Sequence, residues 1–191
     1  IGGAFGIKLH VYAEELVIAA TAKQLARPVQ YNADRLESFV SDAHAREFRA
    51  QARIAATPDG TLQALETDLL GTIGAYSIYP RSSLGDGIQG VTFCGAPYRL
   101  STLHGHARLA YQNKVPSGVY RGVGQPIGCA ITELLIDELA HKLNRDPVEL
   151  RRQNYLSDDD YPYTTAGGLK LTQLSLYACL DRLCEIMDYD K

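Results

Sequence analysis

The chain has 191 residues, 46% of them hydrophobic, and a formal net charge of -3, which suits one sizeable globular domain with room for two sub-lobes. The mild acidity gives no reason to expect nucleic acid or an anionic membrane as a partner, and no apolar run approaches the roughly 20 residues of a membrane span. The four cysteines form no C-x-x-C pair, and Cys129 and Cys179 fall on apolar helix faces, where buried thiols are common. This usage favours a reduced, cytoplasmic setting.

The first motif along the chain is a glycine-rich loop, G-G-A-F-G at residues 2–6, in which backbone amides can face a ligand. Polar and apolar residues then alternate at helical spacing over about residues 12–27. The side chains expected on the buried side of that helix are Leu16, Ala19, Ala20 and Leu25. Asp34 followed by Glu37 forms a capping box that predicts a further short helix.

A β-hairpin is predicted next, because residues 45–56 alternate strictly between apolar and polar side chains. The T-P-D-G turn at residues 57–60 has each residue in a favoured place, and a partner strand is expected from Thr61 to about Leu70. Residues 71–90 are rich in glycine, tyrosine and serine and show no period. A long irregular segment of this kind is usually functional or covered by a partner.

A further strand is expected over about residues 99–112. His104 and His106 would share one face of it, but no third metal ligand lies within reach in the sequence, so we interpret both as structural. Later in the chain, Asp146, Pro147 and Glu149 supply the cap, first-turn proline and acid that begin a helix.

Between these elements, Y-R-G-V-G-Q-P at residues 120–126 precedes the strongest helical pattern in the chain. The expected apolar positions of that helix are Ile127, Ile131, Leu134, Leu135, Leu139 and Leu143. The glycines allow backbone turns that are closed to other residues, and the helix N-terminus would direct amides and the positive end of its dipole at the loop. The loop is therefore either a cradle for an anion or a simple turn before a core helix.

The glycine spacing differs from the dinucleotide-binding fingerprint, because Ile127 occupies its last glycine position. In combination, however, the glycine loop of residues 2–6, the loop of residues 120–126 and D-P-V-E-L-R-R-Q-N at residues 146–154 resemble the molybdenum hydroxylases. That family includes xanthine dehydrogenase, aldehyde oxidoreductase and carbon monoxide dehydrogenase. Its molybdopterin-binding subunit carries G-G-x-F-G, Tyr/Phe-Arg-Gly-x-Gly-x-Pro and D-P-x-E-x-R-x-x-N in this order, so the resemblance covers the whole chain.

The resemblance implies an α+β fold with a mixed β-sheet and helices packed on one side, and it implies that residues 1–191 are part of a molybdopterin-binding domain. The cofactor would be Mo-molybdopterin, as such or in a dinucleotide form, held largely by main-chain amides, with those of Phe5 and Arg121 near the oxo ligand of the metal. The cofactor-binding residues implied are Gly3, Ala4, Phe5, Gly6, Arg121, Gly122, Val123 and Gly124.

In the family, such a subunit hydroxylates an aldehyde or an N-heteroaromatic substrate with oxygen derived from water. Electrons leave through iron–sulfur clusters and FAD on other subunits or domains, so the implied partners are an iron–sulfur subunit, a flavin subunit, a small-molecule substrate and the remainder of the molybdenum-binding subunit. Leu9 stands where purine-oxidising members have a glutamate, and Val123 where they have a phenylalanine. These two positions line the implied substrate pocket and favour aldehydes or simple heterocycles over xanthine.

The general-base glutamate of the family lies later in the subunit, so we assign no catalytic residue here and expect this chain, as a fragment of a longer subunit, to be inactive alone. Two hypotheses from other classes remain open at this point. One is a structural or assembly module whose loops bind nothing, and the other is a phosphate- or nucleotide-binding protein that uses Arg121 and the helix N-terminus. Both leave the match over residues 146–154 unexplained.

Overall fold

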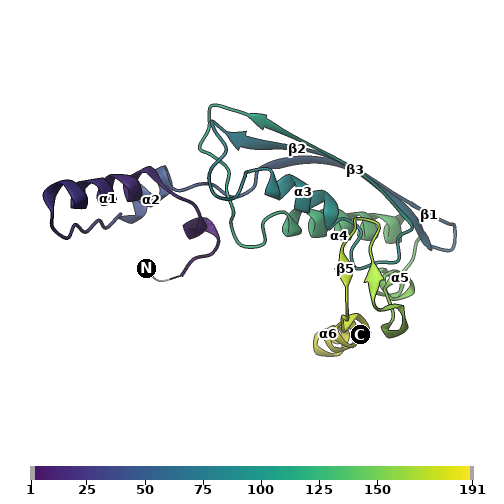
Figure 1. Ribbon diagram of the computed structural model, residues 1–191. Helices are drawn as coiled ribbons and strands as arrows, with labels where there is room; N and C mark the ends of the chain where they lie inside the picture. Colours follow the sequence, from purple (N-terminus) through teal and green to yellow (C-terminus); the bar gives the residue numbers. More distant parts are fainter. Residues whose placement is uncertain (1–2, 190–191) are drawn as a thin grey trace. The chain divides into compact units, whose positions relative to one another are not determined.

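A computed structural model of the protein describes residues 3–189, and residues 1–2 and 190–191 lie outside the described part. The elements, in chain order, are η1 (Ile7–Leu9), α1 (Ala13–Leu25), α2 (Arg35–Ser41), β1 (Phe48–Ala56), β2 (Leu62–Gly74), α3 (Gly85–Thr92), β3 (Thr102–Tyr111), α4 (Gln125–Lys142), α5 (Pro147–Asn154), η2 (Asp158–Asp160), β4 (Tyr163–Thr164), β5 (Lys170–Leu171) and α6 (Leu176–Met187). Figure 1 shows their arrangement.

The chain divides into two compact units. The first comprises the residues up to Arg49 together with Leu70–Gly87 and Arg108–Val123, and the second comprises Ala50–Leu69, Ile88–Ala107 and the residues from Gly124 onward. The three long strands contribute residues to both units. The two glycine loops found in the sequence therefore belong to the first unit up to Val123, while α4 belongs to the second.

The main sheet is mixed, with strand order β1-β2-β3. β1 and β2 form the predicted hairpin around the turn at residues 57–60, where the Gly60 N–H donates to the Thr57 carbonyl at 2.8 Å. β2 and β3 run parallel, as their arrows in Figure 1 show. The C-terminal ends of both strands meet where the Gln112 N–H donates to the Gly74 carbonyl at 2.9 Å. Parallel pairing needs a long crossover, and residues 75–101 with α3 supply it.

Helices cover one face of the sheet in the second unit, as the α+β prediction requires (Figure 1). Close packing depends on glycine at two positions. A Cβ on Gly90 of α3 would lie 2.9 Å from Leu69 Cδ1 of β2, and one on Gly128 of α4 would lie 2.9 Å from the Gly90 carbonyl oxygen. The core of this unit includes Leu65, Leu69, Ile136, Leu150 and Leu156, all of which are buried.

Both predicted helix caps are confirmed. The Asp34 side chain accepts from the Glu37 N–H and the Glu37 carboxylate accepts from the Asp34 N–H, each at 2.8 Å, which is the reciprocal capping box. The Asp146 carboxylate accepts from the N–H groups of Val148 and Glu149 at 2.8 and 2.9 Å, with Pro147 in the first turn. These hydrogen bonds hold the pKa of Asp146 below its usual range.

The third motif, residues 146–154, has a structural role in the second unit. Asn154 is buried, its Oδ1 accepts from the Leu62 N–H at 3.0 Å, and its Nδ2 donates to the carbonyls of Gly60 and Leu150. Arg151 donates to Glu133 of α4 at 2.9 Å and pairs with Asp137 at 2.8 Å. The motif thus attaches α5 to the hairpin turn and to α4.

Several predictions of burial were wrong. The expected inner positions Leu16 and Leu25 of α1 are 64% and 56% exposed, and α1 contains no buried residue. In α4 the buried face is Gly128, Ile131, Thr132, Ile136 and Ala140, whereas Leu134 is exposed. Cys129 and Cys179 are exposed, and Cys94 is the buried thiol. Periodicity identifies a helix and its apolar stripe but does not say whether another part of the molecule covers that stripe.

The prediction of an irregular segment at residues 71–90 was partly wrong as well, because β2 continues to Gly74 and α3 begins at Gly85.

Of the described residues, none lies in a helix long and apolar enough to cross a membrane. A two-stranded antiparallel sheet, β4-β5, pairs Tyr163 with Leu171 and Thr164 with Lys170.

Candidate cofactor-binding site

The first glycine loop turns sharply through left-handed backbone conformations. Gly3, Phe5 and Gly6 have φ angles of 73°, 51° and 88°, and η1 follows at once. Glycine is needed at position 6 because a Cβ there would lie 2.8 Å from Val119 Cγ1 and 3.0 Å from the Val119 carbonyl oxygen. Phe5 is 57% exposed, and Gly2 of the sequence motif lies outside the described residues.

The second loop, residues 120–123, contains two more left-handed residues, Gly122 at φ 90° and Val123 at φ 50°. The Val123 N–H donates to the Tyr120 carbonyl at 2.8 Å and closes the turn. A left-handed valine is unusual, because its branched side chain strains this conformation. The sequence indicated that both flanking glycines could take such turns, but Gly124 has φ -84° and does not.

The two loops lie side by side in the first unit. The Arg121 N–H donates to the Phe5 carbonyl at 2.8 Å. Beside this bond the buried His10 accepts the Val119 N–H on Nε2 at 2.7 Å. Burial lowers the pKa of His10, which keeps the imidazole neutral and able to accept that bond. His10 therefore joins the end of the first loop region to the residue just before the second loop.

This arrangement leaves a small group of amides unused. The N–H groups of Phe5, Gly6 and Gly122 have no hydrogen-bond acceptor within residues 3–189, whereas the Arg121 N–H is taken by Phe5. Amides exposed in left-handed turns form concavities that bind anions. Phosphate and metal-oxo groups offer only acceptor atoms, so the loops suit an anionic group with oxygen atoms.

One residue at this site carries no signal in the sequence. Arg46 lies two residues before β1, yet its guanidinium donates to three carbonyls of the second loop, those of Tyr120, Arg121 and Val123. These acceptors are 74 to 77 residues away along the chain. An arginine before an alternating strand looks like any other solvated charge, and no local pattern could have identified this contact.

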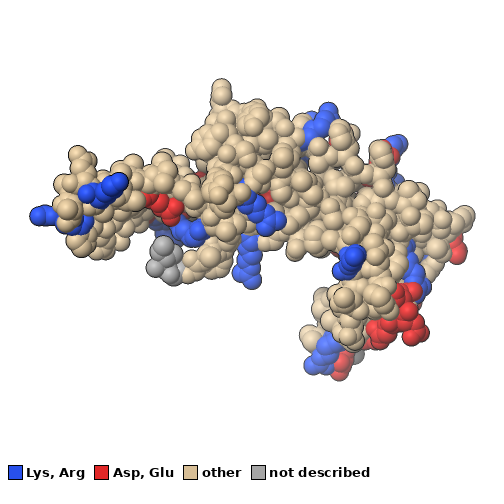
Figure 2. All heavy atoms as spheres, in the orientation of Figure 1, with Lys and Arg blue, Asp and Glu red and all other residues tan. Residues whose placement is uncertain are grey.

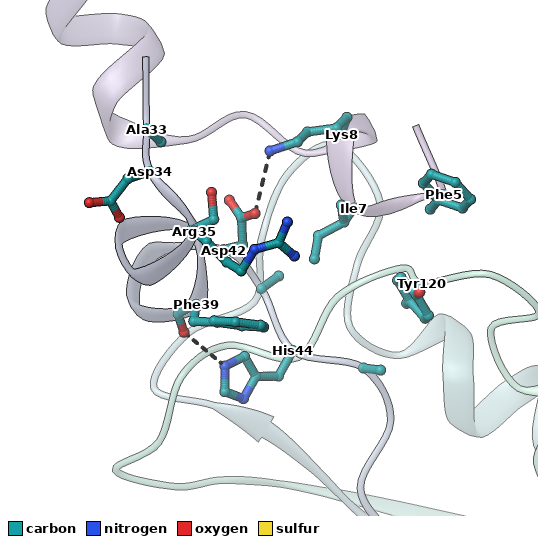
Figure 3. A pocket seen from close by; sticks show the side chains of 13 residues that line it. Phe5, Ile7, Lys8, Ala33, Asp34, Arg35, Phe39, Asp42, His44 and Tyr120 are labelled. Carbon is teal, nitrogen blue, oxygen red and sulfur yellow. Dashed lines mark hydrogen bonds and ion pairs between the residues drawn. The ribbon is translucent and has the colours of Figure 1, made fainter. Parts of the chain in front are cut away.

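A cavity of about 1010 Å³ opens beside both loops in the first unit and is lined by Phe5 and Tyr120 among others. Figure 3 shows Phe5 and Tyr120 at one end and side chains of the α2 region, including Arg35 and Phe39, at the other. Lys8 pairs with Asp42 at 3.3 Å across this space. The cavity combines apolar walls with a few charged groups, which is the usual character of a small-molecule site.

In the second unit, Gly124 caps the N-terminus of α4, and its own N–H donates to Gln89 Oε1 at 3.3 Å. Pro126 has no N–H. Of the first amides of this helix, Gln125 alone therefore keeps a donor that no described residue uses. The helix dipole remains, but the N-terminus offers fewer free amides than the sequence indicated.

The predicted substrate positions are partly exposed. Leu9 ends η1 and is 49% exposed, and Val123 is half-buried in the second loop. Neither residue lines the cavity beside the loops. His104 and His106 are exposed, and among residues 3–189 no group of three or more histidines, cysteines and carboxylates could hold a metal ion.

The molybdopterin cofactor-binding domain family matches residues 1–155 of this chain. The chain belongs to this family. Both glycine loops, the mixed sheet and residues 146–154 lie within the matched residues, so the family is the one that the three sequence motifs indicated.

Individual relatives agree with this assignment. The chain is 33% identical over 190 residues to the nicotine 6-hydroxylase large subunit of Paenarthrobacter nicotinovorans, covering 98% of this chain and 23% of that protein. It is 34% identical over 187 residues to the aldehyde oxidoreductase of Megalodesulfovibrio gigas, covering 96% of this chain and 19% of that protein. The crystal structure of quinoline 2-oxidoreductase from Pseudomonas putida 86 superposes with a TM-score of 0.93 at 32% identity, over 100% of this chain and 24% of that one.

The chain therefore spans about a fifth to a quarter of the length of these relatives. The similarity covers the whole chain and includes all three motifs, but it is a similarity to one segment of much longer subunits.

Proposed function

We propose that this chain is the segment of a molybdenum hydroxylase large subunit that holds one side of Mo-molybdopterin through its two glycine loops. The observation that carries the proposal is the hydrogen bond between Arg121 and Phe5, which places the unused amides of Phe5, Gly6 and Gly122 in one region of a molybdopterin cofactor-binding domain. Gly3 and Ala4 support the first loop, and Val123 and Gly124 continue the second into α4.

Each part of the chain has its own task in this proposal. The amides of Phe5 and Gly122 donate to oxygen atoms of the cofactor, and Gly6 lets the loop pass close to Val119. Arg121 contributes its backbone to the link between the loops. When bound, the cofactor supplies the redox chemistry, in which a substrate C–H becomes C–OH with oxygen from water while two electrons and two protons are released.

The proposed partners follow from the surface as well as from the relatives. α1 and α2 contain no buried residue, and six large apolar side chains on them are exposed: Leu16, Val17, Leu25, Leu36, Phe39 and Val40. In Figure 2 the surface over α1 carries a few basic and acidic side chains, with uncharged atoms between them. Short helices gain most of their stability from packing an apolar face, so we propose that the remainder of the large subunit covers this one.

Iron–sulfur and flavin subunits or domains would then receive the electrons. This part of the proposal rests on the resemblance to the molybdenum hydroxylases and on relatives that are themselves large subunits or chains of complexes.

The function is tested by purifying the complete native subunit with its associated subunits and measuring molybdenum, pterin fluorescence, iron and flavin. We expect close to one molybdenum and one pterin for each large subunit. In the same preparation, amides of α1 and α2 should exchange with deuterium much more slowly than in residues 1–191 alone, because the rest of the subunit covers them.

The alternative classes make different predictions in that experiment. A nucleotide-binding protein would carry phosphate without molybdenum, and a structural module would carry neither. Either result in a complete, correctly assembled subunit would overturn the proposal.

We further propose that the substrate site of the complete subunit favours aldehydes or simple N-heterocycles over xanthine. A purine site needs polar groups that bond ring nitrogens and oxygens, and it rejects ligands that leave those groups unpaired. Leu9 and Val123 offer apolar surface at the two matching positions. In the intact enzyme, kcat/KM for benzaldehyde or quinoline should exceed that for xanthine at least tenfold, or about 1.4 kcal/mol in transition-state binding. A tenfold preference for xanthine would show that other segments decide specificity.

A further inference from the structure

Arg46 makes an unusual set of contacts for a residue at the start of a strand. Its Nε donates to the Val123 carbonyl at 2.5 Å, and one terminal nitrogen donates to the carbonyls of Tyr120 and Arg121 at 2.7 and 2.6 Å. The planar guanidinium presents its donors in a fixed fork, so it can serve several acceptors at once. One side chain thus gathers three carbonyls of the second loop around a positive charge.

The directions of these carbonyls determine the directions of the amides. In a planar trans peptide, the C=O and the following N–H point to opposite sides. Because the Arg121 carbonyl points at Arg46, the Gly122 N–H points away from it. That N–H is one of the donors left without an acceptor within residues 3–189. Arg46 therefore lies behind the loop, on the side opposite to the unused donor.

The backbone around Arg46 is itself held against the segment that leads into the loop. His44 forms a parallel bridge with Ser117, in which the His44 N–H donates to the Pro116 carbonyl at 3.0 Å and the Gly118 N–H donates to the His44 carbonyl at 2.9 Å. This pairing fixes the distance from Arg46 to the loop.

A buried carboxyl group, Asp86, interacts electrostatically with the guanidinium of Arg46. It is 4% exposed, and its Oδ2 has no hydrogen-bond partner within the described part of the chain. Burial raises the pKa of Asp86, while the charges of Arg46 and Arg81 lower it, so the carboxyl and the two guanidinium groups interact within the first unit.

We propose that Arg46 is the positioning residue of the second glycine loop: it holds the loop carbonyls from behind so that the Gly122 amide faces the cofactor. The inference deepens the proposed function and rests on it for the identity of the ligand. The hold on the loop itself needs no ligand, because every contact that carries it lies within the first unit.

The carbonyls that Arg46 binds are close to solvent, since Tyr120 and Arg121 are exposed. Water could satisfy these carbonyls without Arg46, so removing the guanidinium should loosen the loop rather than unfold the protein. A lysine carries the same charge but lacks the rigid fork, and it cannot reach three carbonyls in the same geometry.

The experiment compares Arg46→Gln, Arg46→Lys and the matched control Arg49→Gln in the complete subunit. Arg49 lies three residues further on in β1 and is exposed, and among residues 3–189 it makes no contact comparable to that of Arg46. In cofactor-free protein we expect the Arg121 and Val123 amides, which are both hydrogen-bonded, to exchange at least tenfold faster in Arg46→Gln, with an intermediate rate in Arg46→Lys. The control should match the wild type, and far-UV circular dichroism should be the same in all four proteins.

The same proteins, isolated with cofactor, should show molybdenum content at least threefold lower in Arg46→Gln than in Arg49→Gln. Millimolar guanidinium present during loading should restore part of the occupancy of an Arg46→Ala variant. Unchanged exchange in the loop of Arg46→Gln would overturn the inference whatever the cofactor content. Faster exchange with molybdenum content equal to that of the control would show that the Gly122 amide does not contact the cofactor. Wild-type subunit without molybdenum would instead overturn the proposed function, while the exchange rates would still decide the role of Arg46 in the loop.

Discussion

Gly6→Ala is expected to reduce the molybdenum content of the complete subunit to less than a tenth of the wild-type value. Gly6 has φ 88°, and a Cβ would lie 2.8 Å from Val119 Cγ1 and 3.0 Å from the Val119 carbonyl oxygen. The left-handed strain alone costs about 1–2 kcal/mol, and the contact with Val119 must also be relieved by moving one of the loops. Movement here separates the Phe5 carbonyl from the Arg121 N–H, so the amides no longer converge. Molybdenum and pterin analysis measures the effect.

Gly168→Ala is the matched control, because it also places a Cβ at a residue of positive φ but makes no new contact. Gly168 has φ 85°, and a Cβ at that position would meet no atom within 4 Å. Gly168→Ala should lose about 1–2 kcal/mol of stability and Gly6→Ala at least as much, but Gly168→Ala should keep its molybdenum. If both variants lost the metal equally, general destabilisation would explain the result and the first loop would have no special role.

Asn154→Ala is expected to accelerate hydrogen exchange at the Leu62 amide about 100-fold, which corresponds to roughly 3 kcal/mol of local stability. The wild-type side chain bonds Leu62, Gly60 and Leu150 at 2.9–3.0 Å. Alanine would leave the Leu62 N–H and the Gly60 carbonyl without partners in a buried place, and an unpaired buried group costs more than the bond is worth. Native-state exchange of the complete subunit, resolved to the β2 peptide, measures this change.

Asn32→Ala serves as the control for that experiment. Asn32 is exposed, and its side chain makes one long bond, from Gln30 at 3.3 Å. Its removal should change exchange at Leu62 by less than threefold. An effect of Asn154→Ala no larger than this would mean that water replaces the lost bonds, and that the third motif does not hold the hairpin turn against α5.

Together these predictions separate two kinds of sequence motif within one chain. The two glycine loops lie in the first unit and leave amides available for a ligand, whereas residues 146–154 lie in the second unit and have nearly all their polar groups paired. The third motif therefore has a structural role that the described residues show directly, because it joins α5 to the hairpin turn and to α4.

The sequence by itself determined the features that depend on neighbours two to four residues apart. The capping box at Asp34, the cap at Asp146 and the turn before Gly60 are bonds of this range, and each was predicted correctly. The order of the three motifs was enough to identify the family, and the resemblance to that family implied the α+β class. Local chemistry of this kind is written in consecutive residues and needs no knowledge of the rest of the fold.

Only the tertiary structure decided which groups meet across the chain. Arg46 reaches carbonyls 74 to 77 residues away, His10 accepts from an N–H 109 residues away, and Asn154 bonds the Leu62 N–H over 92 residues. The same limit explains the error in α1, because its pattern predicts a buried apolar stripe that nothing in the described residues covers. A side chain carries its hydrogen-bonding capacity in the sequence, but its partner is fixed by the path of the backbone, and that path is decided by packing over the whole domain.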